Sequence, residues 1–178
     1  MTAPLSTAMP DDARAATPQA GGSVARVRAA LLAAGHDDTI SAFPEGTRTA
    51  EDAARAVGCT VAEIAKSLVF RAKGSARPVL VIASGADRVD LARVAEAVGA
   101  PIERAEGRWV RETTGFAIGG VSPLAHQTPP LVLIDERVMR LSRLWAAAGS
   151  PAHVFATTPE ALLALSGGRV ADVAERPA

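Results

Sequence analysis

Apolar positions recur with helical spacing in some segments of the chain and form short continuous runs in others. Helical spacing predicts helices over residues 24–34 and 87–98, because each stretch carries an apolar stripe and is followed by a glycine. Ser23 stands where it could cap the first of these helices. The remaining helices predicted from the sequence are short.

Three further helix starts are marked by capping residues. Thr49 with Asp52, and Thr60 with Glu63, have the spacing of a capping box, which predicts one helix ending at Gly58 and a second, shorter one after Thr60. Thr158 precedes a proline at the first helical position, and a glycine pair at 167–168 ends that helix. Asp135 is also placed to cap a helical turn near residues 137–141.

Runs of β-branched and aliphatic residues indicate strands between these helices. Residues 67–72 and 78–84 are separated by a glycine-containing segment of five residues, so they predict a β-hairpin. The other expected strands cover residues 38–43, 131–134, 153–156 and 169–173, and a strand is expected to end at 116–118.

Strands and short helices are intermixed without the regular alternation of βαβ units. We therefore predict one α+β domain over residues 23–178, with a curled, mixed and mostly antiparallel sheet surrounded by short helices. Residues 1–22 contain three prolines, two aspartates and no continuous apolar run, and we expect them to form a disordered N-terminal extension.

Composition narrows the classes of protein to which the chain can belong. Hydrophobic residues make up 48% of the chain, which is enough for a core without disulfides, and the single cysteine, Cys59, excludes a disulfide framework. The formal net charge is zero, so any contact with nucleic acid has to come from a local basic patch. No apolar run is long enough to span a bilayer and the first residues do not resemble a signal peptide; we expect a cytoplasmic protein that does not contact membranes.

Lys66 is the first candidate for a catalytic or ligand-binding residue. Only Lys66 and Lys73 are lysines among 19 basic residues, so a lysine at a given position suggests that an arginine would not serve there. Lys66 stands where a short helix is expected to give way to a strand. Two interpretations are open: a surface lysine whose stem covers apolar neighbours, or an ammonium group that holds an anionic or carbonyl oxygen in a pocket.

The segment Gly119-Gly120-Val121-Ser122-Pro123 is the second candidate. Two adjacent glycines allow positive φ and let bare backbone approach a ligand, and the proline stiffens the exit. A tight loop without function has the same composition. The segment lacks the Gly-x-Ser-x-Gly pattern of hydrolases and the Gly-Lys-Ser/Thr of phosphate loops.

The histidines and arginines offer weaker candidates. His36, His126 and His153 are separated in the sequence, so neither a metal site nor a bound cofactor is expected. His126 and His153 are each a candidate hydrogen-bond donor in a pocket, and a Cys59–His126 nucleophilic pair is a further, weaker alternative. Arg104, Arg108 and Arg111 surround Trp109, either as a solvated face or as a patch for the phosphates of an RNA end.

Taken in order, several segments resemble the family of YbaK and prolyl-tRNA-synthetase-associated editing domains. The resemblance covers about residues 24–175, and no single motif decides it. The segments that carry it are Thr49–Gly58, Ile64–Phe70, Asp90–Gly99, Thr114–Leu124 and Gly149–Phe155. Two positions depart from the family pattern: Ala125 stands where relatives often have glycine, and Ala65 where others carry larger groups.

The resemblance implies a curled mixed sheet and the activity of a free-standing aminoacyl-tRNA deacylase. Such an enzyme hydrolyses the ester of tRNA, often proline tRNA, that carries a small wrong amino acid. The family's lysine falls on Lys66 and its Gly-x-x-x-Pro loop on Gly119 to Pro123. A variable pocket position falls near His153, and a pocket-wall position near Phe43.

The hypothesis for the site follows from this resemblance. Lys66, Gly119 and Gly120 are expected to carry catalysis, with Lys66 on the terminal phosphate or the ester carbonyl. The residues expected to bind the substrate are Val121, Ser122, Pro123, His126, His153 and Phe43. The expected partner is the aminoacylated 3′ end of tRNA, with an aminoacyl-tRNA synthetase or an elongation factor as a further partner.

Two alternatives stay open at this point. The same lysine and glycine loop could serve a non-catalytic module that binds aminoacyl-tRNA or an amino-acid-like ligand. A serine or cysteine hydrolase that uses Ser122 or Cys59 is the weaker of the two.

Overall fold

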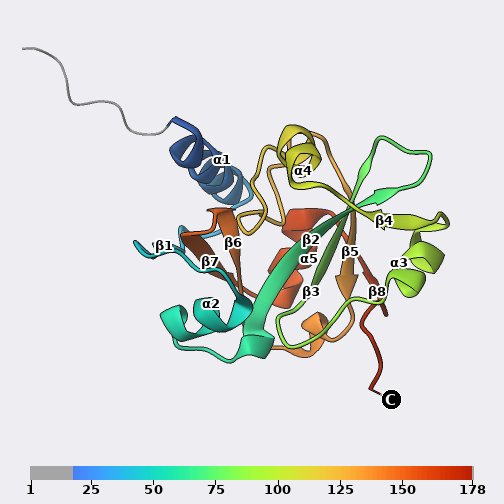
Figure 1. The fold of residues 1–178 in the computed structure, drawn as a ribbon. Helices are drawn as coiled ribbons and strands as arrows, with labels where there is room; N and C mark the ends of the chain where they lie inside the picture. The colour runs from blue at the N-terminus through green and yellow to red at the C-terminus, as the bar shows by residue number, and fades with distance from the viewer. Residues whose placement is uncertain (1–17, 178) are drawn as a thin grey trace, which may run out of the picture.

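The computed structural model describes residues 18–177, and these form a single sheet flanked by helices (Figure 1). Most of the predicted disordered extension, residues 1–17, lies outside the described residues. Residues 18–22 begin a helix. In chain order the elements are α1 (Pro18–Ala33), β1 (Ile40–Ala42), α2 (Ala50–Val57), η1 (Val61–Glu63), β2 (Ile64–Ala72), β3 (Pro78–Ser84), α3 (Leu91–Val98), β4 (Ile102–Arg104), α4 (Gly107–Thr114), β5 (Leu131–Asp135), η2 (Val138–Arg140), β6 (Leu144–Ser150), β7 (His153–Thr157), α5 (Pro159–Ser166) and β8 (Arg169–Ala171).

The eight strands form a mixed sheet in the order β1-β7-β6-β2-β3-β5-β8, with β4 paired to β2. The pairs β1–β7, β6–β7, β2–β3 and β2–β4 are antiparallel, and the pairs β2–β6, β3–β5 and β5–β8 are parallel. The predicted α+β class with a mixed sheet is confirmed, and so is the hairpin of β2 and β3.

One edge of β2 is divided between two partners. β3 pairs with β2 from residue 65 to residue 71 along one edge. On the other edge, β6 pairs with residues 64–65 and β4 pairs with residues 70–72. Residues 66–69 of β2 therefore have no strand partner on that second edge within the described part of the chain, and we call this stretch the open edge of β2.

The two faces of the sheet are covered by different helices. Leu80 and Ile82 of β3 lie in one buried cluster with Leu162 of α5, whereas Val79 and Val81 lie in another with Val94 of α3. This alternation is what a strand buried on both faces produces. Figure 1 shows α5 behind β2 and β3, α1 beside β6, and α3 beside β4.

The capping signals locate most helix starts correctly. The Thr49 hydroxyl accepts a hydrogen bond from the Asp52 amide at 3.1 Å, and the Glu63 carboxylate accepts one from the Thr60 amide at 2.8 Å. Thr158 caps α5 by accepting from the Ala161 amide at 3.2 Å, and Gly167 ends that helix in the left-handed conformation. The Asp135 carboxylate likewise accepts from the amide of Arg137 ahead of η2.

Several predicted boundaries were wrong. α1 begins at Pro18, so Ser23 does not cap it; the Ser23 hydroxyl instead donates to the Gly149 carbonyl at 2.7 Å. α3 begins at Leu91, because Asp90 caps it through the amides of Ala92 and Arg93. Residues 116–118 form no strand, and β4, α4 and β6 were not predicted. Among residues 18–177, no helix has the length and apolar character that a membrane span requires.

Candidate functional site

Two adjoining cavities open where β2 lacks a strand partner. The larger has a volume of about 490 Å³ and the smaller about 290 Å³. Both are lined by the same two segments, the open edge of β2 and the loop before Val121. The residues common to both cavities are Lys66, Ser67, Leu68, Ile118, Gly119 and Val121.

The open edge of β2 gives both cavities a wall of main chain. Apart from the ladder with β3 on the opposite edge, no backbone hydrogen bond from another described segment reaches residues 66–69. In a strand, alternate residues direct their N–H and C=O groups to opposite edges, so one alternate set of these groups faces the cavities. A ligand in either cavity therefore meets fixed backbone donors and acceptors.

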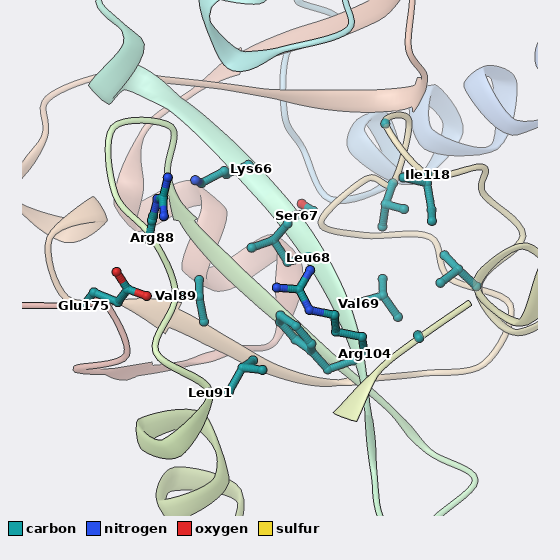
Figure 2. Close-up of a pocket in the computed structure, with 15 residues that line it drawn as sticks. Lys66, Ser67, Leu68, Val69, Arg88, Val89, Leu91, Arg104, Ile118 and Glu175 are labelled. Atoms are coloured by element: carbon teal, nitrogen blue, oxygen red, sulfur yellow. The ribbon is translucent and has the colours of Figure 1, made fainter. Parts of the chain in front are cut away.

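Lys66 is the third residue of β2 and lies half-buried between the cavities. Its amine donates a hydrogen bond to the carbonyl oxygen of Asp87. Burial lowers the pKa of the amine; the nearby charge of Asp87 acts in the opposite direction and that of Arg88 in the same direction. In Figure 2 the side chain leaves β2 toward Arg88, while Ile118 lies across the strand. The ammonium group thus reaches the cavity region but is held by a carbonyl that a substrate would have to replace.

The two glycines of the pair are required for different structural reasons. Gly119 has φ of +90°, a conformation that other residues rarely adopt. Gly120 has an ordinary φ, but a Cβ atom added to it would lie 2.6 Å from the Cα atom of Ser150. Gly119 lines both cavities, whereas Gly120 makes the close contact that seats the loop on the turn between β6 and β7.

His153 is the first residue of β7 and lines the smaller cavity together with Ser150. Its Nδ1 atom lies 2.6 Å from the Ser150 hydroxyl, and that hydroxyl oxygen accepts a hydrogen bond from the Ala152 amide at 3.1 Å. Which of the two groups donates, the Ser150 hydroxyl or Nδ1–H, depends on the tautomer of the imidazole. In either tautomer the contact fixes the orientation of the ring, with Nε2 at the end away from Ser150.

The other predicted site residues do not line either cavity. Ser122 is fully buried, and Pro123 is buried beside it. The amide of Phe43 donates to the Ala152 carbonyl at 2.7 Å, so Phe43 is connected to the turn before His153 but is absent from the cavity wall. Roles for these residues in substrate binding stay predictions.

His126 packs inside the protein. Its Nε2 lies 2.6 Å from the Ser122 carbonyl oxygen, and its ring meets Phe116 edge-on at 5.3 Å between centroids. Burial lowers the pKa of this imidazole, which favours its neutral form. These contacts hold the exit of the glycine loop in place, and they suggest that His126 positions the loop and does not contact a ligand.

Ala125 is the one non-glycine residue with positive φ in the described chain, at 64°. Its carbonyl accepts a hydrogen bond from the Arg26 side chain at 2.9 Å, which keeps the backbone in this conformation. This is also a position at which the sequence departs from the family pattern that it resembles, which often has glycine there.

We predict that A125G stabilises the protein by about 0.5–1 kcal/mol. The left-handed conformation costs an alanine about 1–2 kcal/mol, and the added freedom of glycine in the unfolded chain offsets about half of that gain. Unfolding in urea measures the change, with A152G as the control at ordinary φ. A loss of stability in A125G would contradict the proposed backbone strain.

Sequence reasoning missed several residues that line the cavities, and three of them have notable surroundings or chemistry. Ile118 lines both and is 63% exposed, which is unusual for a large apolar side chain. Arg48 and Trp145 line the smaller cavity, and the indole nitrogen of Trp145 is buried with no partner among residues 18–177. Arg48 and Trp145 belong to no recognisable motif, and Ile118 lies in the segment Thr114–Leu124 but was not chosen as a site residue. Arg104 of the predicted basic patch lines the larger cavity, whereas Arg108 forms an ion pair with Glu112 at 2.9 Å.

Ser122 and Cys59 are poorly placed for the role of a nucleophile. Ser122 has no exposed surface, and Cys59 lines neither cavity. The Cys59 thiol donates to the Thr60 carbonyl at 3.3 Å, and burial raises its pKa, which disfavours the reactive thiolate.

Comparison with known proteins identifies relatives over most of the chain. Residues 44–165 match the family model described as aminoacyl-tRNA editing domain. The protein YwhH of Bacillus subtilis, which is uncharacterized, is 29% identical over 148 residues, covering 83% of this chain and 94% of its own length. A protein of Enterococcus faecalis named "Putative Cys-tRNA(Pro)/Cys-tRNA(Cys) deacylase EbsC" is 28% identical over 133 residues, or 74% of this chain and 80% of its own.

Solved structures show the same fold. One, described as a "putative trans-editing enzyme for prolyl tRNA synthetase", is 43% identical and superposes with a TM-score of 0.81 over 86% of this chain and 98% of its own. The hypothetical protein APE2540 is 26% identical with a TM-score of 0.78, over 84% of this chain and 99% of its own.

Proposed function

The chain belongs to the aminoacyl-tRNA editing domain family, and on this premise we propose that it hydrolyses the ester of tRNA carrying a small wrong amino acid. Its relatives support an aminoacyl-tRNA deacylase in general. Proline tRNA is the first tRNA to test, because one relative is described as a putative trans-editing enzyme for prolyl tRNA synthetase and the name of another includes Cys-tRNA(Pro) beside Cys-tRNA(Cys). We place the activity in the cytoplasm, where a synthetase or an elongation factor would be at hand as a partner.

The observation that carries the proposal is the smaller cavity. It brings together Lys66, Gly119 and His153, which are far apart in the sequence. Its volume of about 290 Å³ lies at the lower end of the range for ligand pockets, about 300–1,000 Å³. A cavity of this size can hold a small aminoacyl group, and the side chains that line it would determine which amino acids are accepted.

The proposed reaction needs only positioned dipoles and one charge. A water oxygen bonds to the ester carbonyl carbon, the bond from that carbon to the ribose oxygen breaks, and the ribose oxygen takes the proton. Lys66 would turn from the Asp87 carbonyl to the developing oxyanion or to the terminal phosphate, which exchanges one acceptor for another. The backbone of Gly119 and Val121, with the open edge of β2, would hold the aminoacyl group, and the adjacent ribose hydroxyl would orient the water.

A panel of mischarged tRNAs tests the proposal. Purified protein is incubated with labelled Ala-, Cys-, Ser- and Pro-tRNA, and release of the amino acid is followed over time. We expect release from at least one small wrong amino acid and little from correctly charged Pro-tRNA. Protection of every ester would instead favour the non-catalytic binding module.

His153 is expected to affect which amino acid is removed. Substitution H153A removes the imidazole from the cavity wall and enlarges the smaller cavity, so the ratio of kcat/KM values between two small amino acids should change by about 10-fold. The melting temperature should change little, because the ring packs at the cavity wall. H36A provides a control, since His36 lies outside both cavities. Unchanged ratios across the panel would remove His153 from the pocket.

A further inference from the structure

A third cavity, separate from the two at β2, is lined by α1, the end of α4 and the turn between β6 and β7; we call it the α1–α4 cavity. Its volume is about 390 Å³, and it shares only Ser150 and Pro151 with the smaller cavity and no residue with the larger one. Figure 1 shows α1 and α4 together in the upper part of the molecule. The polar side chains on its wall come from Ser23, Arg26, Arg111, Gln127 and Ser150.

The charge on the wall of the α1–α4 cavity is entirely positive. Arg26 and Arg111 line it, and no aspartate or glutamate among the described residues does. Glu112, which follows Arg111 in the sequence, forms its ion pair with Arg108 at 2.9 Å. Neither Arg26 nor Arg111 takes part in any ion pair within residues 18–177. Two like charges around one cavity concentrate ions of the opposite sign there.

Arg26 is a half-buried guanidinium without a carboxylate. Its Nε atom donates to the Ala125 carbonyl at 2.9 Å and its Nη2 atom to the Gly115 carbonyl at 3.2 Å, and the group lies 4.7 Å from the centre of the Phe116 ring. These contacts use only part of the five N–H donors of a guanidinium and neutralise none of its charge. Charges taken out of water are usually paired with opposite charges, so an anionic ligand fits this position.

The packing at Gly115 keeps two donor groups side by side. A Cβ atom added to Gly115 would lie 2.6 Å from Nη2 of Arg26 and 2.9 Å from the Cδ atom of Gln127, so both side chains lie against this residue. Gln127 therefore adds an amide with two N–H donors next to the guanidinium. The cavity volume lies within the range of about 300–1,000 Å³ for ligand pockets, which indicates a ligand larger than a single ion.

We propose that the α1–α4 cavity binds the phosphate group of a phosphate ester, with Arg26, Arg111 and Gln127 as the donors. A phosphate supplies the negative charge that two guanidinium groups neutralise, and it has more acceptor oxygens than a carboxylate for N–H groups on three side chains. The rest of the cavity would hold the organic part of the ester. That ester is either a small metabolite or a segment of RNA backbone, and the site does not depend on the hydrolysis proposed above.

Arg26 connects this site to the loop that carries Gly119. The carbonyls that it holds belong to Gly115 and Ala125, at the two ends of the segment 115–125. A phosphate that fixes the guanidinium would also fix both ends of that segment. Binding to the folded protein alone should therefore raise the melting temperature.

Titration of the intact protein with inorganic phosphate, followed by NMR at constant ionic strength, tests the site. We expect saturable binding that R111A weakens by about 10-fold, because one of two cations is lost. Arg111 is exposed and has no side-chain partner within residues 18–177, so this variant should fold normally. R28A is the matched control on α1, and K66A should bind phosphate as the wild type does, since neither residue lines the α1–α4 cavity.

A charge placed inside the cavity gives a second test that leaves both arginines intact. Ala117 lines the cavity, so A117E would place a carboxylate beside the arginines and should abolish phosphate binding. A117Q has nearly the same shape without the charge and should retain most of the binding. Absence of phosphate binding to the wild type, or binding that R111A and A117E leave unchanged, would overturn the site.

Deacylated tRNA distinguishes the two sources of the phosphate without any reaction. If RNA supplies it, R111A and A117E should each weaken tRNA binding by about 10-fold, and A117Q should not. If the two variants weaken the binding of inorganic phosphate but not of tRNA, the ligand is a small phosphate ester. Because no step uses a mischarged tRNA, a failure of the editing activity would leave this result unchanged.

Discussion

Substitution K66A is expected to lower kcat/KM for deacylation by about 10²–10³-fold while the protein stays folded. Removal of one positioned donor to a developing oxyanion costs about this much in other hydrolases. The folded state loses only the bond from the amine to the Asp87 carbonyl, worth about 1 kcal/mol, together with the packing of a half-buried stem. Single-turnover deacylation and thermal unfolding measure the two effects separately.

Substitution K66R shows what the ammonium group itself contributes. A guanidinium keeps the positive charge but is larger and planar, so we expect it to recover less than a tenth of the lost rate. Full recovery would mean that charge alone is needed. Near-normal turnover of K66A on a good substrate would remove Lys66 from the mechanism.

Substitution G120A is expected to cost about 2–3 kcal/mol of stability and most of the activity. Its added Cβ would lie 2.6 Å from the Cα atom and 2.8 Å from the carbonyl carbon of Ser150, and neither backbone atom can rotate away. The loop that carries Gly119 would have to separate from Ser150, at the turn that precedes His153. Displacement of both walls by a few tenths of an ångström disturbs the alignment of substrate and water, so kcat/KM should fall at least 10-fold.

The matched control for this substitution is G22A. Gly22 lies in α1 with open space at its Cβ position, so alanine there should leave stability unchanged or raise it by up to about 1 kcal/mol. Urea unfolding and deacylation rates of the two variants are compared side by side. A G120A protein that is as stable and as active as the wild type would show that the contact with Ser150 relaxes freely.

The sequence predicts those parts of the fold that depend on local signals. Thr49, Asp52, Thr158 and Gly167 mark helix ends because a capping interaction involves residues only a few positions apart. β6 could not be recognised, since Leu144–Ser150 consists largely of small residues with no clear period. Its strand conformation depends on pairing with β2 and β7, which are distant in the sequence.

The candidate site, like the fold, was predicted only in the parts that local sequence motifs indicate. Lys66, Gly119, Val121 and His153 were chosen from motifs, and the structure places all four around one cavity. His126 has the same donor groups as His153, but only the tertiary structure shows that its ring packs on Phe116. Arg88, by contrast, belongs to no motif.

The glycine pair shows that a sequence motif does not by itself reveal what each of its residues does. Both glycines were expected to bring bare backbone close to a ligand, and only Gly119 lines the cavities. Gly120 is required by the approach of Ser150, a contact across 30 positions that no spacing rule contains. A sequence pattern indicates that a small residue is needed, and the packing determines the reason.

The open edge of β2 has a consequence for how this protein can change over evolutionary time. Main-chain amides and carbonyls are the same whichever side chain is attached, so mutation at residues 66–69 cannot delete them, except by proline, which removes a donor. Main-chain groups can therefore continue to bind the invariant part of a substrate while the surrounding side chains mutate and the selectivity for the variable part changes. Alanine scanning would overlook such a contribution, and replacement of single amides by esters would reveal it.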